Sequence, residues 1–311
     1  MAHNRRRFIQ QSGSLVSGLW LSSLERMIPA RPEFITNSKF KSMFLATNWC
    51  FNGSISEYCS SVQKEGYDGI EIWWPMEKKA QDELFSALKK YNLQVGFLCG
   101  AYHKDVSEHF ASFKDMVYAA ASNTVQTPLY INCHSGRDFF PADKNQLFFD
   151  YTAHLSKQTG ILICHETHRS RILFAPVIAR NYLEKNPDLK ITFDVSHWCT
   201  VSESLLADQQ ETVDLALERT EHIHARIGHA EGPQVNDPRA PEWAAAVTAH
   251  FSWWDKVVER KRREGGRITF LSEFGPPDYM PTLPYTRQPL ADQWAINVYM
   301  MQILRKRYST I

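Results

Sequence analysis

The sequence lacks the charge excess, the cysteine spacing and the long apolar run that mark several classes of protein. Lysine and arginine (35) nearly balance aspartate and glutamate (34), so the formal net charge is +1. So small a charge gives no electrostatic case for nucleic acid or an anionic membrane as partner. The six cysteines show no CxxC spacing, which favours buried free thiols over a small disulfide-stapled scaffold. An oxidising compartment would still permit a disulfide.

The sequence also lacks a glycine-rich phosphate-binding fingerprint and any shift in composition that would separate two domains. The missing fingerprint argues against a doubly wound open sheet, which is the alternative to the fold inferred below. A length of 311 residues with 43% hydrophobic residues is normal for one soluble α/β barrel.

Short apolar runs alternate with helical patterns along the chain. The eight runs cover residues 42–47, 69–73, 94–98, 128–133, 161–165, 190–194, 222–226 and 267–273. They are mostly continuous, which is typical of parallel strands that are buried on both faces. Residues 77–91 and 142–159 have helical periodicity and are followed by Asn92 and Gly160, which are common helix terminators. Eight alternations predict a single-domain (β/α)8 TIM barrel over residues 39–311.

Four of the predicted strands end in a residue that can bind a metal ion: Glu166, Asp194, His224 and Glu273. They are separated by 28, 30 and 49 residues, and the first two gaps each match about one strand–helix unit. These side chains should therefore meet at the catalytic face of the barrel. Three carboxylates and one imidazole suit one divalent ion, Mn, Mg, Co or Zn.

Two histidines compete for the position on the seventh strand. His222 and His224 are two residues apart, so they point to the same side of a strand. We take His224 as the ligand and His222 as its neighbour.

Two irregular segments, residues 229–243 and 275–289, follow the seventh and eighth strands. Loops at this end of a barrel usually cover the site, so we expect a lid or a wall of the substrate pocket there.

The chain resembles the xylose-isomerase-like barrel superfamily, whose members are often described as sugar phosphate isomerases or epimerases. The resemblance spans roughly residues 40–308 and is carried by residues 66–71 (GYDGIE), 165–167 (HET), 194–197 (DVSH), 222–224 (HIH) and Glu273. In the keto-sugar 3-epimerases of that superfamily, Glu, Asp, His and Glu at these strand ends hold one divalent ion.

The resemblance implies roles for individual residues of this chain. Its metal ligands would be Glu166, Asp194, His224 and Glu273. His197, at the position of the superfamily's Asp-x-x-His histidine, would contact substrate, and Arg226 would bind a substrate oxygen.

The sequence departs from the epimerase pattern in the loop after the fifth strand. Ile172 stands where those epimerases have a further glutamate, and the Gly-Glu turn after the strand-seven histidine is absent. His168, Arg169 and Arg171 instead bring imidazole and positive charge near the site.

Three further residues near strand ends are candidates for substrate contact. Glu71 and His134 lie at the ends of the second and fourth predicted strands, and Trp198 follows the sixth. His168 joins them as a substrate-binding candidate. Helix capping, structural pairing or core packing is the alternative role for each.

The predicted site fits chemistry at a carbon next to a carbonyl. A divalent ion polarises the carbonyl, while Glu166 and Glu273 act as base and acid on an enediolate intermediate. We therefore expect a metal-dependent isomerase or epimerase that acts on a small sugar or polyol.

Other functions fit the same residues. The same enolisation would serve a lyase or dehydratase on a keto-sugar or keto-inositol, and a non-catalytic sugar-binding protein is the alternative of another class. The balanced charge disfavours an apurinic endonuclease. The sequence is compatible with a homo-oligomer but does not specify one.

The N-terminus, residues 1–38, is interpreted as an export signal or tail outside the barrel. Residues 4–10 (NRRRFIQ) resemble the twin-arginine export motif, and the weakly apolar stretch at residues 12–24 is too short to span a bilayer. This predicts a periplasmic protein, with cleavage near Ala30 and no membrane association beyond export. A basic, frayed tail on a cytoplasmic protein is the alternative.

Replacement of both Arg5 and Arg6 by lysine tests the export signal. The export receptor reads the guanidinium pair, so the variant should stay in the cytoplasm although its charge is unchanged. Cell fractionation measures this, with replacement of Arg31 by lysine as the control. An unchanged distribution between compartments would rule out the twin-arginine interpretation.

Overall fold

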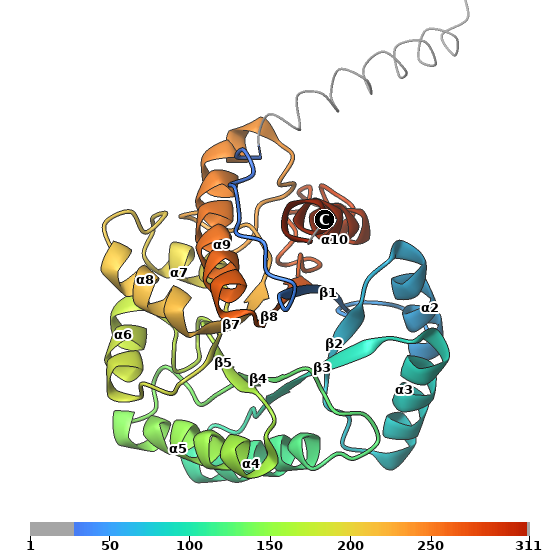
Figure 1. The fold of residues 1–311 in the computed structure, drawn as a ribbon, viewed down its shortest axis with the longest axis vertical. Coiled ribbons are helices and arrows are strands. Elements are labelled where there is room, and N and C mark those ends of the chain that lie inside the picture. The colour runs from blue at the N-terminus through green and yellow to red at the C-terminus, as the bar shows by residue number, and fades with distance from the viewer. Residues whose placement is uncertain (1–27, 310–311) are drawn as a thin grey trace, which may run out of the picture.

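Eight parallel strands close into a barrel, with helices packed around the outside (Figure 1). A computed structural model describes residues 28–309. Each strand pairs with the next in sequence, and the first pairs with the last. The strands are β1 (Lys41–Thr47), β2 (Gly69–Trp73), β3 (Gln94–Gly100), β4 (Ile131–His134), β5 (Ile163–Glu166), β6 (Ile191–Phe193), β7 (Thr220–His224) and β8 (Arg267–Ser272). This confirms the predicted (β/α)8 barrel.

The helices that cover the barrel lie between successive strands and after the last one. They are α2 (Ile55–Glu65), α3 (Lys78–Tyr91), α4 (Val106–Ala121), α5 (Ala142–Thr159), α6 (Pro176–Lys185), α7 (Val195–Val201), α8 (Gln210–Arg219), α9 (Ala244–Glu264) and α10 (Gln293–Tyr308), with a short 3-10 helix, η1 (Pro241–Trp243), before α9. Asn92 and Gly160 take the left-handed conformation at the ends of α3 and α5, with φ of 52° and 71°. The two predicted helix ends are therefore confirmed.

Two strands end earlier than the apolar pattern suggested. Strand β7 ends at His224, so Arg226 lies in the loop that follows instead of in the strand. Strand β6 ends at Phe193, because Asp194 becomes the N-cap of α7 and accepts a hydrogen bond from the Ser196 amide at 3.0 Å. Both shifts move polar groups onto the catalytic face of the barrel.

Part of the segment assigned to the N-terminal tail lies against the barrel. The Arg307 guanidinium donates hydrogen bonds to the carbonyls of Pro29 at 2.6 Å and Ala30 at 3.0 Å. The Phe34 ring packs on Tyr308 with 6.0 Å between centroids. In Figure 1 this segment, in dark blue, runs along α9 toward β1. Residues 28–38 are thus part of the folded body, although they form no helix or strand.

The twin-arginine motif and the stretch at residues 12–24 lie outside the described residues. Within residues 28–309, no helix has the length and hydrophobicity needed to cross a membrane. All six cysteines are free; five are buried, whereas Cys50 is exposed.

Helix α10 holds the chain immediately after β8 through one buried side chain. The Phe274 amide donates to Asn297 Oδ1 at 2.7 Å, and Asn297 Nδ2 donates to the Phe274 carbonyl at 2.9 Å. The same kind of amide pairing links the next residue, Gly275, to Gln234 in the loop after β7, at 2.6 and 3.1 Å. These two clamps fix the backbone on the C-terminal side of Glu273.

Replacement of Asn297 by alanine should lower the free energy of unfolding by about 2–4 kcal/mol, because it leaves two buried backbone groups of Phe274 without partners. Urea denaturation measures this. The control is Gln293→Ala on the same helix, which loses one part-buried hydrogen bond to the Trp49 carbonyl. The free energy of unfolding of Gln293→Ala should fall by only about 1 kcal/mol. Equal losses for the two variants would contradict the clamp.

Candidate active site

The four predicted metal ligands lie at the carboxyl ends of consecutive strands. Glu166 is the last residue of β5 and His224 the last residue of β7. Asp194 and Glu273 directly follow β6 and β8. In a parallel barrel this face carries the loops that build active sites.

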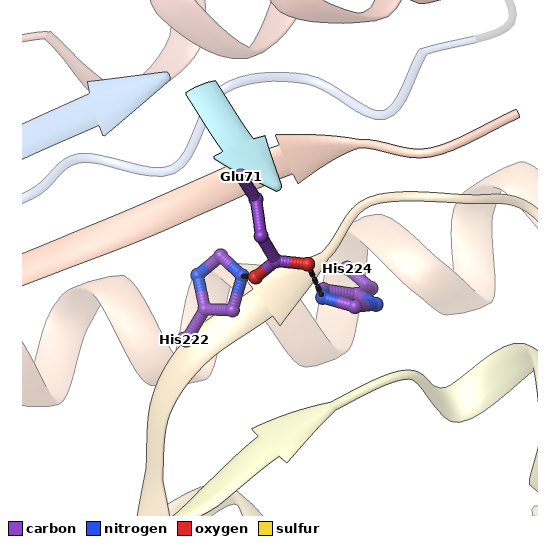
Figure 2. Close-up of side chains that lie close together, drawn as sticks. All are labelled: Glu71, His222 and His224. Carbon is purple, nitrogen blue, oxygen red and sulfur yellow. Dashed lines mark ion pairs between the residues drawn. The ribbon is translucent and has the colours of Figure 1, made fainter. Parts of the chain in front are cut away.

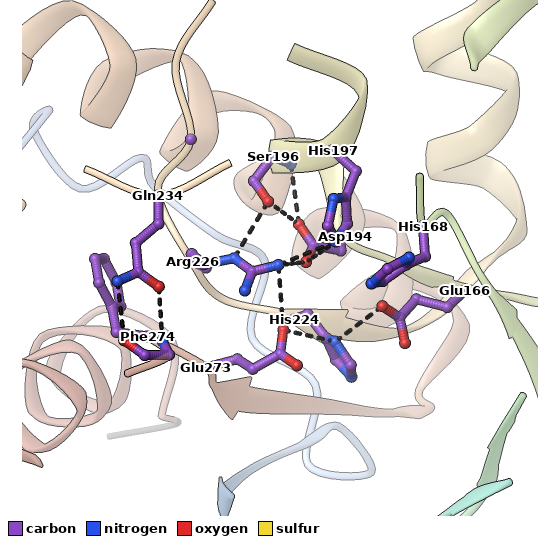
Figure 3. Close-up of polar contacts among 12 residues, drawn as sticks. Glu166, His168, Asp194, Ser196, His197, His224, Arg226, Gln234, Glu273 and Phe274 are labelled. Atoms are coloured by element: carbon purple, nitrogen blue, oxygen red, sulfur yellow. Dashed lines mark hydrogen bonds and ion pairs between the residues drawn. The ribbon is translucent and has the colours of Figure 1, made fainter. Parts of the chain in front are cut away.

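The side chains of these four residues converge. His224 Nδ1 lies 2.9 Å from Glu273 Oε2 and 3.7 Å from Glu166 Oε1. Figure 3 shows the two glutamates on opposite sides of the His224 ring. Asp194 completes the set, because it offers an oxygen within 4.8 Å of the ligand atoms of His224 and Glu273 and also belongs to a similar group with Glu166.

Three of the converging atoms are buried and make no hydrogen bond of good geometry among the described residues, although two of them form an ion pair at 2.9 Å. They are Glu166 Oε1, His224 Nδ1 and Glu273 Oε2. Buried polar atoms are normally paired, so a cluster of orphaned atoms requires an explanation. Asp194, His224 and Glu273 form one group that could hold a cation, and Glu166 joins Asp194 in the neighbouring group. The donor set, oxygens with one imidazole nitrogen, fits a divalent metal ion.

The charge balance of the site also favours a cation. Glu71, Glu166, Asp194 and Glu273 all contact His224 or Arg226. Burial, reinforced by Glu273 and Glu166 and opposed by Arg226, raises the pKa of Asp194 to about 6. Although burial lowers the pKa of His224, Glu273, Glu166 and Glu71 raise it well above its ordinary value, so His224 adds a positive charge to that of Arg226. These two cations do not balance four carboxylates crowded out of water.

Arg226 lies among the candidate ligands. Its Nη2 atom is 2.5 Å from Asp194 Oδ2 and 3.7 Å from Glu273 Oε2. It also donates to His197 Nε2 at 3.1 Å. Burial lowers the pKa of Arg226, but the neighbouring Asp194 and Glu273 outweigh burial and raise this pKa above its ordinary value. Arg226 therefore holds Asp194 in place as well as bordering the cavity described below.

Glu166 is held through its second oxygen. Oε2 accepts hydrogen bonds from Asn132 Nδ2 at 2.8 Å and lies 2.9 Å from His134 Nε2. This leaves Oε1 directed toward His224. Sequence reasoning missed Asn132; the available signal was its place two residues before His134, on the same side of β4.

Glu71 supports His224 from the opposite side (Figure 2). Its two carboxylate oxygens lie 3.3 Å from His224 Nε2 and 3.3 Å from His222 Nε2. Burial raises the pKa of Glu71, but the contacts with His224 and His222 outweigh burial and hold this pKa below its ordinary value. A carboxylate on the far nitrogen of a metal-binding histidine fixes its ring and tautomer. His222 is turned away from the ligand cluster, because its Nδ1 contacts Thr269 Oγ1 at 2.7 Å.

A cavity of about 480 Å³ lies over this site. Five of the predicted site residues line it: Glu71, His134, His168, Arg226 and Glu273. The remaining lining residues are Thr47, Asn48, Trp49, Cys50, Ile72, Trp73, Leu98, Tyr102, Arg171 and Tyr279. The volume suits a monosaccharide-sized ligand, and the tryptophan and tyrosine faces suit the C–H faces of a sugar.

The histidine pair His168 and His197 lies beside the ligand cluster, with 4.0 Å between ring centroids. Burial, with His134 nearby, lowers the pKa of His168 to about 3. Burial and His168 likewise hold the pKa of His197 below its ordinary value. Both rings are therefore neutral near neutral pH. His197 is fully buried and does not border the cavity, so it reaches the site through Arg226 and His168.

The structure places one predicted substrate-binding residue in the core. Trp198 is fully buried, packs on Phe193 and donates from Nε1 to the Leu173 carbonyl at 2.9 Å, so it belongs to the core and not to the substrate site. Ile172 is also a core residue. A large aromatic side chain gains more from burial than from a place at the rim.

The two predicted loops contribute differently. Residues 275–289 supply Tyr279, whose ring faces the Arg226 guanidinium at 4.8 Å and borders the cavity. The described residues 229–243 supply none of the lining, contrary to the prediction of a wall. Their contribution is Gln234, which holds the loop after β8.

Neither a protein-family model nor a curated protein matches the sequence. Solved structures do. The 3-keto-D-glucoside 4-epimerase YcjR from E. coli matches with a TM-score of 0.55 and 14% identity, over 86% of this chain and 100% of that chain. A D-tagatose 3-epimerase-like protein matches with a TM-score of 0.54 and 15% identity, over 85% and 96%.

A dehydratase matches equally well. The probable 3-DHS dehydratase AsbF from Bacillus anthracis has a TM-score of 0.54 and 15% identity, over 85% of this chain and 98% of that chain. The chain has the xylose-isomerase-like barrel fold. At these identities the likeness shows the fold alone, so the chemistry of this xylose-isomerase-like barrel must be argued from its own residues.

Replacement of His224 by alanine should weaken binding of a divalent metal ion by more than the 10–100-fold typical for loss of a supporting group. His222→Ala should stay within about 10-fold, because both of its nitrogens face Glu71 and Thr269. Metal analysis after dialysis against Mn, Mg, Co or Zn measures this. Greater metal loss in His222→Ala would exchange the roles of the two histidines.

Proposed function

We propose that the protein is a metal-dependent isomerase or epimerase that acts on a small sugar or polyol through an enediolate intermediate. The observation that carries the proposal is the placement of Glu166 and Glu273 on opposite sides of His224, each with an unpaired oxygen, beneath a monosaccharide-sized cavity. The metal would be held by Glu166, Asp194, His224 and Glu273. When bound, a divalent ion polarises a substrate carbonyl and acidifies the neighbouring C–H.

Glu166 is suited to remove the proton. Although burial raises it, His134 and His224 hold the pKa of Glu166 well below its ordinary value, so the carboxylate is ionised before substrate arrives. The hydrogen bond from Asn132 and the contact with His134 fix the orientation of the carboxylate that would take the proton from carbon. A base whose geometry is fixed before binding loses little when the reaction begins.

Glu273 is suited to return a proton from the other side. It borders the cavity, and the Asn297 clamp fixes the residue after it. A proton returned to the opposite face of the same carbon inverts that carbon. A proton returned to the adjacent carbon isomerises the sugar instead.

The comparisons support this class of chemistry. Two similar structures are described as sugar epimerases or epimerase-like, which agrees with a pair of proton-transferring carboxylates. The orientation of both glutamates toward His224 favours catalysis over a purely sugar-binding role.

Dehydration of a keto-sugar or keto-inositol is a second candidate, favoured by one specific observation. His134 and His168 lie on the Glu166 side of the site, with 4.8 Å between ring centroids, and both border the cavity. An imidazole there could relay the proton that Glu166 removes from carbon to the departing β-hydroxyl, which leaves as water. The fold match to a dehydratase agrees with this alternative. A product lighter by one water would distinguish dehydration from epimerisation.

Replacement of Glu166 or Glu273 by glutamine keeps an oxygen but removes the titrating group. Each variant should lower turnover by about 10²–10⁴-fold. Glu273→Gln should still exchange the substrate α-hydrogen in deuterated water, whereas Glu166→Gln should not. NMR of the incubated sugars measures the exchange.

The control for both variants is Glu221→Gln, which removes a carboxylate paired with Lys261 on the same barrel, outside the site. Its turnover should be that of the wild type. Normal turnover in a metal-loaded Glu166 or Glu273 variant would leave that glutamate as a ligand only.

A further inference from the structure

Arg171 is a buried cation that borders the cavity without a partner. Its side chain is 7% exposed, yet neither Nε nor Nη1 has a hydrogen-bond partner within the described part of the chain. No carboxylate among residues 28–309 lies within ion-pair distance of it. Burial of an unpaired charge is unfavourable, so such a group marks a place where a partner binds.

The other buried arginines of the described residues are all paired. Arg226 contacts Asp194, Arg307 contacts Asp255 at 2.7 Å, and Arg262 donates to the Tyr308 carbonyl at 2.9 Å. Arg171 is the exception. Of these four arginines, Arg171 and Arg226 border the cavity.

The loop after β5 holds Arg171 in this position. Ser170 takes the left-handed conformation with φ of 64°, and the Arg171 amide donates to the His168 carbonyl at 3.1 Å. The next residue, Ile172, is buried in the core, and its amide donates to the Ser135 carbonyl at 3.2 Å. Arg171 thus stands between two fixed neighbours, and its backbone cannot swing out to solvent without breaking these contacts.

The surroundings of Arg171 add positive charge. Burial, followed by the nearby guanidinium of Arg137, lowers the pKa of Arg171 below its ordinary value, while Tyr102, Glu166 and Asp138 act weakly in the other direction. Arg137 Nε is itself without a hydrogen-bond partner among the described residues. The Tyr102 ring lies 5.7 Å from the Arg171 guanidinium and covers one side of it. An anion in the cavity beside Arg171 would relieve this repulsion.

We propose that Arg171 binds a carboxylate of the substrate, so that the enzyme acts on a sugar acid or a related hydroxy-keto acid. This rests on the proposed function, because the carboxylate would anchor one end of the substrate while Glu166 and Glu273 act on the other. A guanidinium presents a planar fork of donors that matches two carboxylate oxygens.

A carboxylate fits better than a phosphate for a reason of charge. Of the arginines that border the cavity, Arg226 is already engaged by Asp194, which leaves one free guanidinium for one negative charge. Arg137 does not border the cavity, so a phosphate dianion next to a carboxylate-rich site would be only half neutralised by direct contact.

Two matched sets of ketoses test the proposal, each differing only at the last carbon. They are D-fructose, D-fructuronate and D-fructose 6-phosphate, and D-tagatose, D-tagaturonate and D-tagatose 6-phosphate. Calorimetry measures binding to the full metal-loaded chain, and NMR in deuterated water measures exchange at the carbon next to the carbonyl. The variants are Arg171→Gln, Arg171→Lys, which keeps the charge but not the fork, and Arg169→Gln as a charge-matched control two residues away.

A uronate should bind about 10²-fold more tightly than its neutral ketose. Arg171→Gln should abolish that difference, Arg171→Lys should keep part of it, and Arg169→Gln should keep most of it. Because the guanidinium is unpaired without ligand, the Tm of ligand-free Arg171→Gln should equal or exceed that of the wild type. A markedly lower Tm would indicate a structural role and overturn the proposal.

The remaining outcomes separate this proposal from the proposed function. Deuterium exchange with a uronate that binds no more tightly than its neutral ketose would overturn the carboxylate subsite and leave the proposed function standing. Arg171-dependent binding of a uronate without exchange would support the subsite and contradict the proposed function. Preference for the phosphates would overturn the carboxylate assignment, and failure of every probe to bind would contradict both.

Discussion

The crowding of three carboxylates around one imidazole is the constraint on which the rest of the site depends. Glu166, Asp194 and Glu273 surround His224 in a space from which water is largely excluded, and like charges so close repel one another strongly. Such an arrangement is stable only if something outside the four residues holds each side chain in place. Arg226 supplies part of the positive charge, and a bound cation would supply the rest.

The supporting contacts come from every direction around His224. Asn132 holds Glu166 from β4, Glu71 holds His224 from β2, and Asn297 in α10 holds the chain next to Glu273. Asn132 and Glu71 each contact one atom of a candidate ligand and leave its second atom directed at the cluster, whereas Asn297 fixes the backbone of Phe274. The pattern is that of a preorganised site, in which orientation is set before any ligand arrives. A set of acids brought together by chance on a surface would have no such support.

The sequence was sufficient for the fold and for the ligand cluster because both depend on periodicity. Parallel strands end at one face, so residues placed at the ends of successive apolar runs, such as Glu166 and Asp194, had to meet. The hydrogen-bond partners of individual side chains could not be predicted from the sequence in the same way. Asn132 is one polar residue within an apolar strand, and nothing along the chain indicates which acid it will contact.

Residues whose role depends on their three-dimensional environment were the least predictable. Trp198 follows a strand end, as a sugar-stacking residue would, yet an aromatic side chain in that position can equally enter the core. The sequence predicted only that Arg171 brings positive charge near the site. Its lack of a partner could not be predicted, because it depends on the positions of all the surrounding residues. The boundary of β7 moved because Arg226 pairs with Asp194 beyond the end of the strand.

The amide pairing between Gln234 and Gly275 divides the barrel into two unlike halves. It joins the loops after β7 and β8, on the side that carries Asp194, His224 and Glu273. The opposite wall, from Thr47 to Tyr102, contributes none of the four candidate ligands. Glu71 is the exception in that wall, because it holds His224. Substitution of the other residues there would reshape the pocket while the reactive half keeps its geometry.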